Sequence, residues 1–181
     1  MRLVGMPIAI VLVALAACGG DDDIDPGAGE PETITVTSTE FVDGGGIPAD
    51  FTCDGRDHSP PLRWGERTGG VASLAVIMDD LDADFVHWVA YDMNKELAGI
   101  DFIGKTETFP GGGGDQGTNG FGEFGYGGPC PPEGETHTYR FRVFALAEMV
   151  DLEPGATADE LEAAMEGIIH QQGELTGTYG R

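Results

Sequence analysis

The 181-residue sequence predicts a mainly β domain with one helix close to its carboxyl end. Hydrophobic residues alternate or run continuously in four segments of strand length, whereas apolar residues three and four positions apart occur together once, after residue 157. The 30 glycines and 11 prolines supply the turns that a chain of short strands requires. The length suits one domain with a sizeable core.

Four segments have the pattern of β-strands. Residues 33–41 alternate β-branched and polar residues, as a half-buried strand does, whereas residues 71–78 form a nearly continuous apolar run typical of a buried strand. Residues 85–93 and 136–147 complete the set. In the last segment, alternation predicts an inner face made of His137, Tyr139, Phe141, Val143 and Ala145. The arginines that alternate with them are expected on the opposite face.

A single helix is expected after these strands. Thr157 and Glu160 have the spacing of a capping box, in which each side chain bonds the backbone N–H of the other residue. We expect Gly173 to end the helix and a short final strand to occupy residues 174–179. The buried stripe of this helix is expected to be Leu161, Met165, Ile168 and Ile169.

Two long segments rich in turn residues, 43–66 and 109–135, lie between the strands. The second holds many glycines and has no strand pattern. A loop of that length inside a compact domain is usually functional or disordered, so this segment is a candidate part of a site.

The amino terminus has the composition of an export signal. Arg2 precedes an apolar run that is too short to span a membrane comfortably. The run ends in Leu-Ala-Ala-Cys-Gly, which resembles a bacterial lipoprotein signal in which Cys18 is lipidated; an ordinary signal cut near Ala17 is the alternative. We expect an extracytoplasmic protein of the cell envelope or periplasm, attached to the membrane by this lipid. The predicted divisions are a leader at 1–17, an acidic tether rich in glycine and proline at 18–32 and a folded domain at 33–181.

The charge of the chain narrows the classes of partner. Acidic residues number 32 against 9 basic ones, a formal charge of −23. A nucleic-acid binder needs a basic face to displace counterions from phosphates, so no nucleic-acid partner is expected. Adsorption to an anionic membrane through a polybasic patch is excluded on the same ground. An acidic surface of this kind is compatible with a saline habitat.

Two cysteines other than the candidate lipidation site occur within the predicted domain, Cys53 and Cys130. An exported protein folds where disulfides persist, so these residues are candidates for a disulfide that would close a long loop. Two buried thiols or a metal pair remain the alternatives, because the sequence does not supply the distance between the two positions.

Four short segments together resemble one protein family. They are Phe-Thr-Cys-Asp-Gly-Arg-Asp-His-Ser-Pro-Pro-Leu-Arg-Trp at 51–64, Asp-Asp-Leu-Asp-Ala followed by Phe-Val-His-Trp-Val within 79–89, Gly-Tyr-Gly-Gly-Pro-Cys-Pro-Pro at 125–132 and His-Thr-Tyr-Arg-Phe at 137–141. In this order and spacing they resemble the phosphatidylethanolamine-binding protein family, in its bacterial Raf-kinase-inhibitor-like branch. The resemblance implies a β-sandwich with a large central antiparallel sheet, a C-terminal helix and a small anion-binding pocket at one end.

The resemblance also implies which residues form that pocket. Three positions depart from the family pattern: Leu81 replaces a proline, Thr138 an arginine and Gly120 an aspartate. The loss of the proline predicts a less rigid turn. The ligand-binding residues implied by the family motifs are Asp80, Asp82, His87, Gly128, Pro129, His137 and Tyr139.

The chemistry of these residue types agrees with an anion site. Both histidines lie on faces that are otherwise apolar, where burial favours the neutral imidazole and a nearby carboxylate favours the charged one. With the two aspartates beside them, one or both histidines are expected to be protonated and to bind phosphate or carboxylate. Loop N–H groups around Gly127 and Gly128 are expected to add donors. The alternative is a pair of core histidines, each satisfied by a carboxylate, with no ligand.

Other kinds of chemistry lack their motifs. The sequence has no compact metal-binding pattern such as His-Glu-x-x-His and no Gly-x-Ser-x-Gly nucleophile elbow, so no metal, no cofactor and no catalytic residue are expected. We therefore predict a non-enzymatic protein that binds a small anionic ligand, either a phospholipid headgroup or a phosphate monoester such as phosphoethanolamine. The alternative is a protein-interaction or protease-inhibitor module of the cell envelope, whose partner the sequence does not identify.

Overall fold

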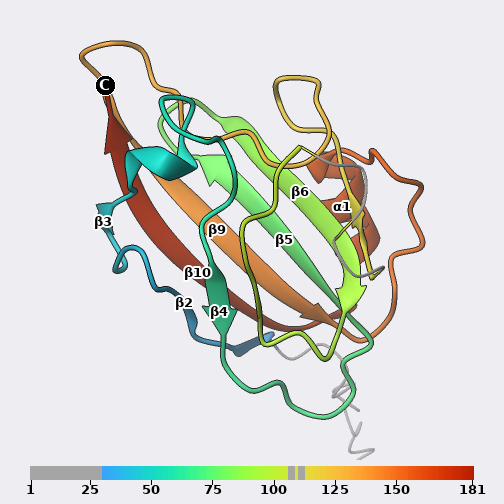
Figure 1. Cartoon of the computed structure of the whole chain (residues 1–181). Coiled ribbons are helices and arrows are strands. Elements are labelled where there is room, and N and C mark those ends of the chain that lie inside the picture. The colour runs from blue at the N-terminus through green and yellow to red at the C-terminus, as the bar shows by residue number, and fades with distance from the viewer. Residues whose placement is uncertain (1–29, 106–108, 110–112) are drawn as a thin grey trace, which may run out of the picture.

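A computed structural model describes residues 30–105, 109 and 113–181. These residues form a large sheet, a small sheet and one α-helix (Figure 1). Within the described ranges no helix is long and apolar enough to cross a membrane. The predicted leader and Cys18 lie outside the described residues.

The large sheet has the strand order β1-β10-β9-β5-β6-β8, with β3 also paired to β10. Its long strands are β5 (Ser73–Asp80), β6 (Phe85–Asn94), β9 (Thr136–Leu146) and β10 (Ile169–Gly180). Its short strands are β1 (Glu32–Thr33), β3 (Gly45–Gly46) and β8 (Asp115–Gln116). The small sheet consists of β2 (Val36–Ser38), β4 (Leu62–Trp64) and β7 (Gly99–Ile100). The helices are α1 (Ala158–Met165) and a 3₁₀ turn, η1 (Ala49–Phe51).

The large sheet is mixed, although its long strands are antiparallel to their neighbours. Strands β6, β5, β9 and β10 pair antiparallel in that order, whereas β1 and β3 both pair parallel to β10 at the edge. The predicted large central antiparallel sheet is confirmed in the long strands, and the two short edge strands make the sheet mixed. The reason is that the amino-terminal part of the chain runs beside β10 in the same direction, which strand patterns in the sequence do not show.

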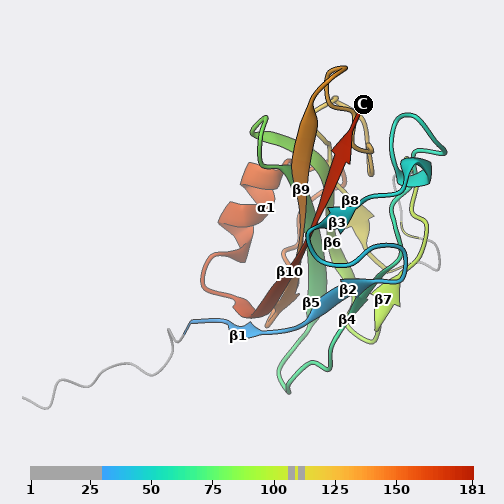
Figure 2. The same cartoon turned by 90° about the vertical axis from the view of Figure 1, so that its left-hand side faces the viewer.

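Each face of the large sheet packs on a different layer (Figure 2). One face packs on the small sheet, where the core includes Leu62, Trp64 and Phe141. The other face is covered by α1, whose Leu161 and Met165 pack in a second core with residues of β5, β6 and β9. The predicted alternation along β9 is confirmed, because its inner residues from His137 to Ala145 are buried and the arginines between them are only partly buried.

Three of the four predicted strands are confirmed as β5, β6 and β9. The prediction of one strand over 33–41 is wrong, because the chain crosses from the large sheet to the small one within it. The N–H of Ile34 still donates to the carbonyl of Gln172 on β10 at 2.9 Å, whereas the carbonyl of Thr35 already accepts from Gly65 beside β4 at 3.0 Å. Consecutive residues thus belong to different layers, which an alternating pattern does not reveal.

The capping box of α1 is confirmed, but the predicted end of the helix is wrong. Thr157 Oγ1 accepts from the N–H of Glu160 and the Glu160 carboxylate accepts from the N–H of Thr157. The helix ends at Met165, and Gly167 adopts a left-handed φ of 79° that turns the chain into β10. Gly173 lies inside β10, where a Cβ atom would strike the backbone of Ile34. The final strand is therefore longer than expected.

Candidate ligand-binding site

The carboxyl end of β5 and the amino ends of β6 and β9 lie at the same end of the large sheet, close to the carboxyl terminus of the chain (Figure 1). Asp80 is the last residue of β5, while His87 and His137 lie near the first residues of β6 and β9. Because β5 is antiparallel to both neighbours, Asp80 pairs with Phe85 on one side and with Tyr139 on the other. Residues distant in the sequence therefore meet at one site.

Asp80 and His137 form a buried pair at this site. Asp80 Oδ2 lies 2.7 Å from His137 Nδ1, and Oδ1 of the same carboxylate accepts the N–H groups of Asp82 and Ala83 at 2.9 and 3.2 Å. The carboxylate therefore closes its own turn with one oxygen and holds the imidazole with the other. The hydrogen bond to Asp80, followed by one to Glu135, raises the pKa of His137, so the charged imidazolium is favoured.

Asp82 contacts neither histidine. Its Oδ2 accepts the backbone N–H of Thr138 at 2.6 Å, and the N–H of Leu81 donates to the Thr138 carbonyl at 2.9 Å. These two bonds fasten the turn after β5 to β9. A proline at position 81 has no N–H and could not make the bond to the Thr138 carbonyl. Leu81 makes this bond, so the substitution adds a hydrogen bond to a turn that was expected to be less rigid without the proline.

His87 occupies an aromatic environment. Its ring lies 5.0 Å from the ring of Phe85, 5.5 Å from that of Phe121 and 5.2 Å from that of Tyr139, measured between centroids. Its Nδ1 lies 2.7 Å from the Gly127 carbonyl, which only accepts, so Nδ1 carries a proton. Burial lowers the pKa of His87, and the neutral imidazole is favoured. Only one of the two histidines is therefore favoured in its charged form.

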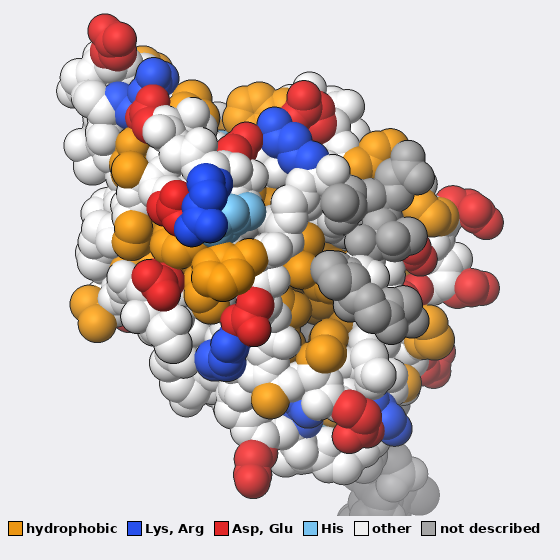
Figure 3. Space-filling view, viewed as in Figure 1, with side chains coloured by type: hydrophobic (Ala, Val, Ile, Leu, Met, Phe, Trp, Pro, Cys, Tyr) orange, Lys and Arg blue, Asp and Glu red, His pale blue; other side chains and the backbone are white. Residues whose placement is uncertain are grey.

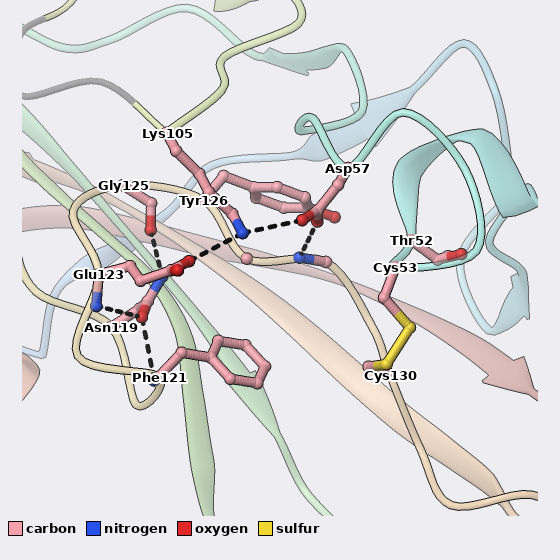
Figure 4. Close-up of polar contacts among 12 residues, drawn as sticks. Thr52, Cys53, Asp57, Lys105, Asn119, Phe121, Glu123, Gly125, Tyr126 and Cys130 are labelled. Atoms are coloured by element: carbon pink, nitrogen blue, oxygen red, sulfur yellow. Dashed lines mark hydrogen bonds and ion pairs between the residues drawn. A yellow bond between two sulfur atoms is a disulfide. The ribbon is translucent and has the colours of Figure 1, made fainter.

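The backbone donors expected in the glycine-rich loop are already engaged. The N–H of Gly127 donates to the His87 carbonyl at 2.9 Å, and that of Gly128 donates to Asp57 Oδ1 at 2.6 Å (Figure 4). The carbonyl of Pro129 accepts from the N–H of Cys53 at 3.1 Å. The expectation of free N–H donors at Gly127 and Gly128 is wrong, because both of these groups serve to fix the loop in place.

Four residues that sequence reasoning missed as site residues hold this loop: Asp57, Lys105, Asn119 and Glu123 (Figure 4). Lys105 Nζ lies 3.1 Å from Asp57 and 2.8 Å from Glu123, and so bridges two segments. Buried Asn119 accepts the N–H of Phe121 at 3.0 Å and donates to the Gly125 carbonyl at 2.9 Å. No local pattern marks these residues, because each acts through a contact between loops or across a turn.

Gly120, the third departure from the family pattern, has a packing reason. A Cβ atom at this position would strike the ring of Phe85. That ring packs edge-on against Phe121, with 4.7 Å between centroids, and both rings flank His87. Glycine at 120 thus permits the aromatic wall of the site, and no aspartate fits there without moving Phe85.

The two predicted cysteines form a disulfide beside the site, 77 positions apart in the sequence (Figure 4). The bond joins the segment after η1 to the loop that carries Gly128 and Pro129. In the chain-entropy model, a closed loop of this size stabilises a fold by about 4 to 5 kcal/mol.

Tyr139 lies between the histidines, with its ring 5.2 Å from that of His87 and 6.4 Å from that of His137. The side chain is fully buried, and burial raises the pKa of its hydroxyl well above the usual value, so it stays an O–H donor. Among the described residues this hydroxyl has no hydrogen-bond partner of normal geometry. A buried hydroxyl left unpaired is costly and calls for a ligand or water.

The fold and this site together define a class: a mainly β protein of two packed sheets with a histidine–aspartate site at one end. Residues 37–180 match the family model described as phosphatidylethanolamine-binding protein. The chain belongs to that family.

Relatives and solved structures agree with this assignment. The chain is 40% identical to the UPF0098 protein PH1269 of Pyrococcus horikoshii, covering 99% of this chain and 94% of the relative. It is 35% identical to a Mycobacterium tuberculosis protein, LppC, whose name describes it as a candidate lipoprotein, covering 93% and 91% of the two chains. The crystal structure of the phosphatidylethanolamine-binding protein homologue CT736 of Chlamydia trachomatis matches with a TM-score of 0.74 and 32% identity, over 83% of this chain and 99% of that one. E. coli YbcL matches with a TM-score of 0.75 and 26% identity, over 82% and 98%.

Proposed function

We propose that this domain is a non-enzymatic binding protein for a small anion, either a phospholipid headgroup or a phosphate monoester. The observation that carries the proposal is the buried Tyr139 hydroxyl, which has the rings of two histidines beside its own and no hydrogen-bond partner of normal geometry among the described residues. A phosphate oxygen would accept a hydrogen bond from this hydroxyl, and the adjacent His137 imidazolium would supply the positive charge.

Each neighbouring residue has a defined part in this proposal. Asp80 keeps His137 charged and fixes the direction of its ring, whereas Asp82 holds the turn against β9. His87 is neutral before binding, and an anion brought beside it favours the protonated imidazole. Binding is therefore expected to take up a proton from solution near neutral pH.

We also propose that the chain is a lipoprotein anchored through Cys18 and exposed outside the cytoplasm. The candidate lipoprotein name of one relative supports the anchor, and the Cys53–Cys130 disulfide supports an oxidising compartment. The mass of the amino-terminal peptide from the mature protein tests the proposal. A diacylglycerol-modified Cys18 at the amino terminus is expected, and an unmodified residue there would refute the anchor.

Calorimetric titration with inorganic phosphate and with phosphoethanolamine tests the binding function. We expect the wild type to bind and His137→Ala to lose at least about tenfold in affinity, because the substitution removes the imidazole together with its positive charge. His170→Ala is the matched control, since His170 lies on β10 and contacts Thr68 rather than the site. Absence of binding by the wild type, or equal binding by His137→Ala, would overturn the proposal.

A further inference from the structure

The outward nitrogen of His137 is covered by a carboxylate from the same chain. Glu135 Oε2 lies 3.2 Å from His137 Nε2, on the side of the ring opposite the buried Asp80 contact. The Glu135 side chain is 58% exposed, whereas that of Asp80 is 5% exposed. We propose that Glu135 is a specificity-determining residue: it competes with the ligand for His137 and makes the pocket prefer singly charged anions to doubly charged ones. This inference rests on the proposed function.

The competition follows from the number of donors on the ring. An imidazolium has one N–H on each nitrogen, and Asp80 already holds the N–H of Nδ1. A carboxylate and a phosphate oxygen make the same kind of charge-assisted bond to the remaining N–H on Nε2. An anion that binds His137 through this atom must therefore displace Glu135.

The backbone at Glu135 is held, so the side chain has to move instead of the loop. The N–H of Glu135 donates to the Pro132 carbonyl at 3.1 Å, and its carbonyl accepts the N–H of Arg181 at 3.2 Å. The carbonyl of Arg181 in turn accepts from Gly134 at 2.7 Å. The same turn begins just after the disulfide at Cys130. A displaced Glu135 carboxylate therefore stays within reach of the bound ligand.

The charges around the site set the preference. Asp80 and Asp82 are tied to His137 and to the Thr138 N–H, so neither turns away when a ligand enters. Asp80 and Glu135 thus contact one imidazole whose charged form is favoured, and Asp82 adds a third negative charge nearby. A displaced Glu135 repels the ligand, and Coulomb repulsion doubles when the ligand carries two charges instead of one. The geometry thus favours a phosphodiester or carboxylate over a dianionic phosphate monoester.

Titrations with methyl phosphate and dimethyl phosphate at pH 7 test the inference. The monoester carries mainly two charges at this pH and the diester one. For Glu135→Gln we expect the affinity for methyl phosphate to rise about tenfold and that for dimethyl phosphate about threefold. Glu133→Gln is the matched control, because it removes an equal charge from an exposed position in the same turn.

The outcomes separate this inference from the function on which it rests. A gain for Glu135→Gln that is larger for methyl phosphate than for dimethyl phosphate, and that Glu133→Gln does not share, supports it. Equal gains for the two esters would overturn the preference for singly charged anions. If the wild type binds but Glu135→Gln gains no more than Glu133→Gln, or binds more weakly, Glu135 is not a competitor and the inference alone is overturned. If neither ester binds to any of the three proteins, the proposed function fails and the inference fails with it. The His137 pKa, followed by NMR, gives a reading without ligand: it should fall in Glu135→Gln and stay unchanged in Glu133→Gln.

Discussion

The two histidines of the site sit in opposite environments. His137 has a carboxylate on each ring nitrogen, from Asp80 and from Glu135, which raise its pKa. His87 is enclosed by aromatic rings and contacts the Gly127 carbonyl, and burial lowers its pKa. One residue type therefore supplies a group favoured as charged and a group favoured as neutral within one site. The neighbouring groups, and not the imidazole itself, determine which histidine is favoured as charged and which as neutral.

The supports of the two histidines differ as well. The His137 side is built on paired strands and on the short turn after β5, which Asp80 and Asp82 close. The His87 side depends on long loops that are held by Asp57, by Lys105 and by the disulfide (Figure 4). Substitutions that loosen these loops should therefore change the environment of His87 more than that of His137.

Removal of the disulfide is expected to have the largest effect. The double variant Cys53→Ser/Cys130→Ser should lose up to about 4 kcal/mol in the free energy of unfolding, because the closed loop is long. Urea denaturation of oxidised wild type and of the variant measures the loss. NMR titration of the folded variant should show a larger pKa change for His87 than for His137. Equal stability, or a larger change at His137, would contradict the division into two supports.

Asp80→Asn is expected to have the next largest effect. The asparagine oxygen keeps the two backbone bonds of the turn, but the charge beside His137 is lost. The pKa of His137 should fall, and the affinity for phosphate should fall about tenfold or more. Asp82→Asn is the control, because Asp82 bonds a backbone N–H and neither ring. NMR titration would refute the assignment if both variants shifted His137 equally.

Lowering the pH should change the contributions of the two histidines to folding stability in opposite directions. The raised pKa of His137 gives stability that is complete below the unfolded value near 6.5 and is lost as the pH rises through the folded value. The lowered pKa of His87 gives stability that is present above about 6.5 and is lost as the pH falls through the folded value. Each slope is at most about 1.4 kcal/mol per pH unit.

The variants His137→Gln and His87→Gln separate these contributions. From pH 8 to 6, the stability of wild type relative to His137→Gln should increase. From pH 7 to 5, the stability of wild type relative to His87→Gln should decrease. Urea denaturation at each pH measures both differences, and slopes of the same sign would show that the two environments are alike.

Salt should have the smallest effect. With a formal charge of −23 and carboxylates at the site, the protein repels anionic ligands at low ionic strength. On the face over the small sheet, acidic and basic side chains are interspersed, so that view shows no basic patch to oppose the net charge (Figure 3). Phosphate-ester affinity should rise about twofold to threefold from 50 to 300 mM sodium chloride. A steady fall in the calorimetric affinity would argue against this repulsion.

Some residues of the site can be predicted from the sequence and others cannot. The motifs around Asp80, His87 and His137 stand at strand ends, and alternation along β9 indicated which face His137 takes. Asp57 and Glu135 were missed, because each acts through a side chain that reaches another segment or folds back on its own turn. Spacing in the sequence carries no information about such contacts.

By itself, the sequence determined the long strands β5, β6 and β9, the faces of β9, the start of α1 and the residue types available for an anion site. These features depend on local periodicity and capping, which act over a few residues. Only the tertiary structure decided where the chain passes between sheets, where the helix ends, which loop N–H groups remain free and which histidine is favoured as the charged one. Those outcomes depend on burial and on contacts between distant segments, and a pKa or a free donor exists only once the chain has brought its neighbours together.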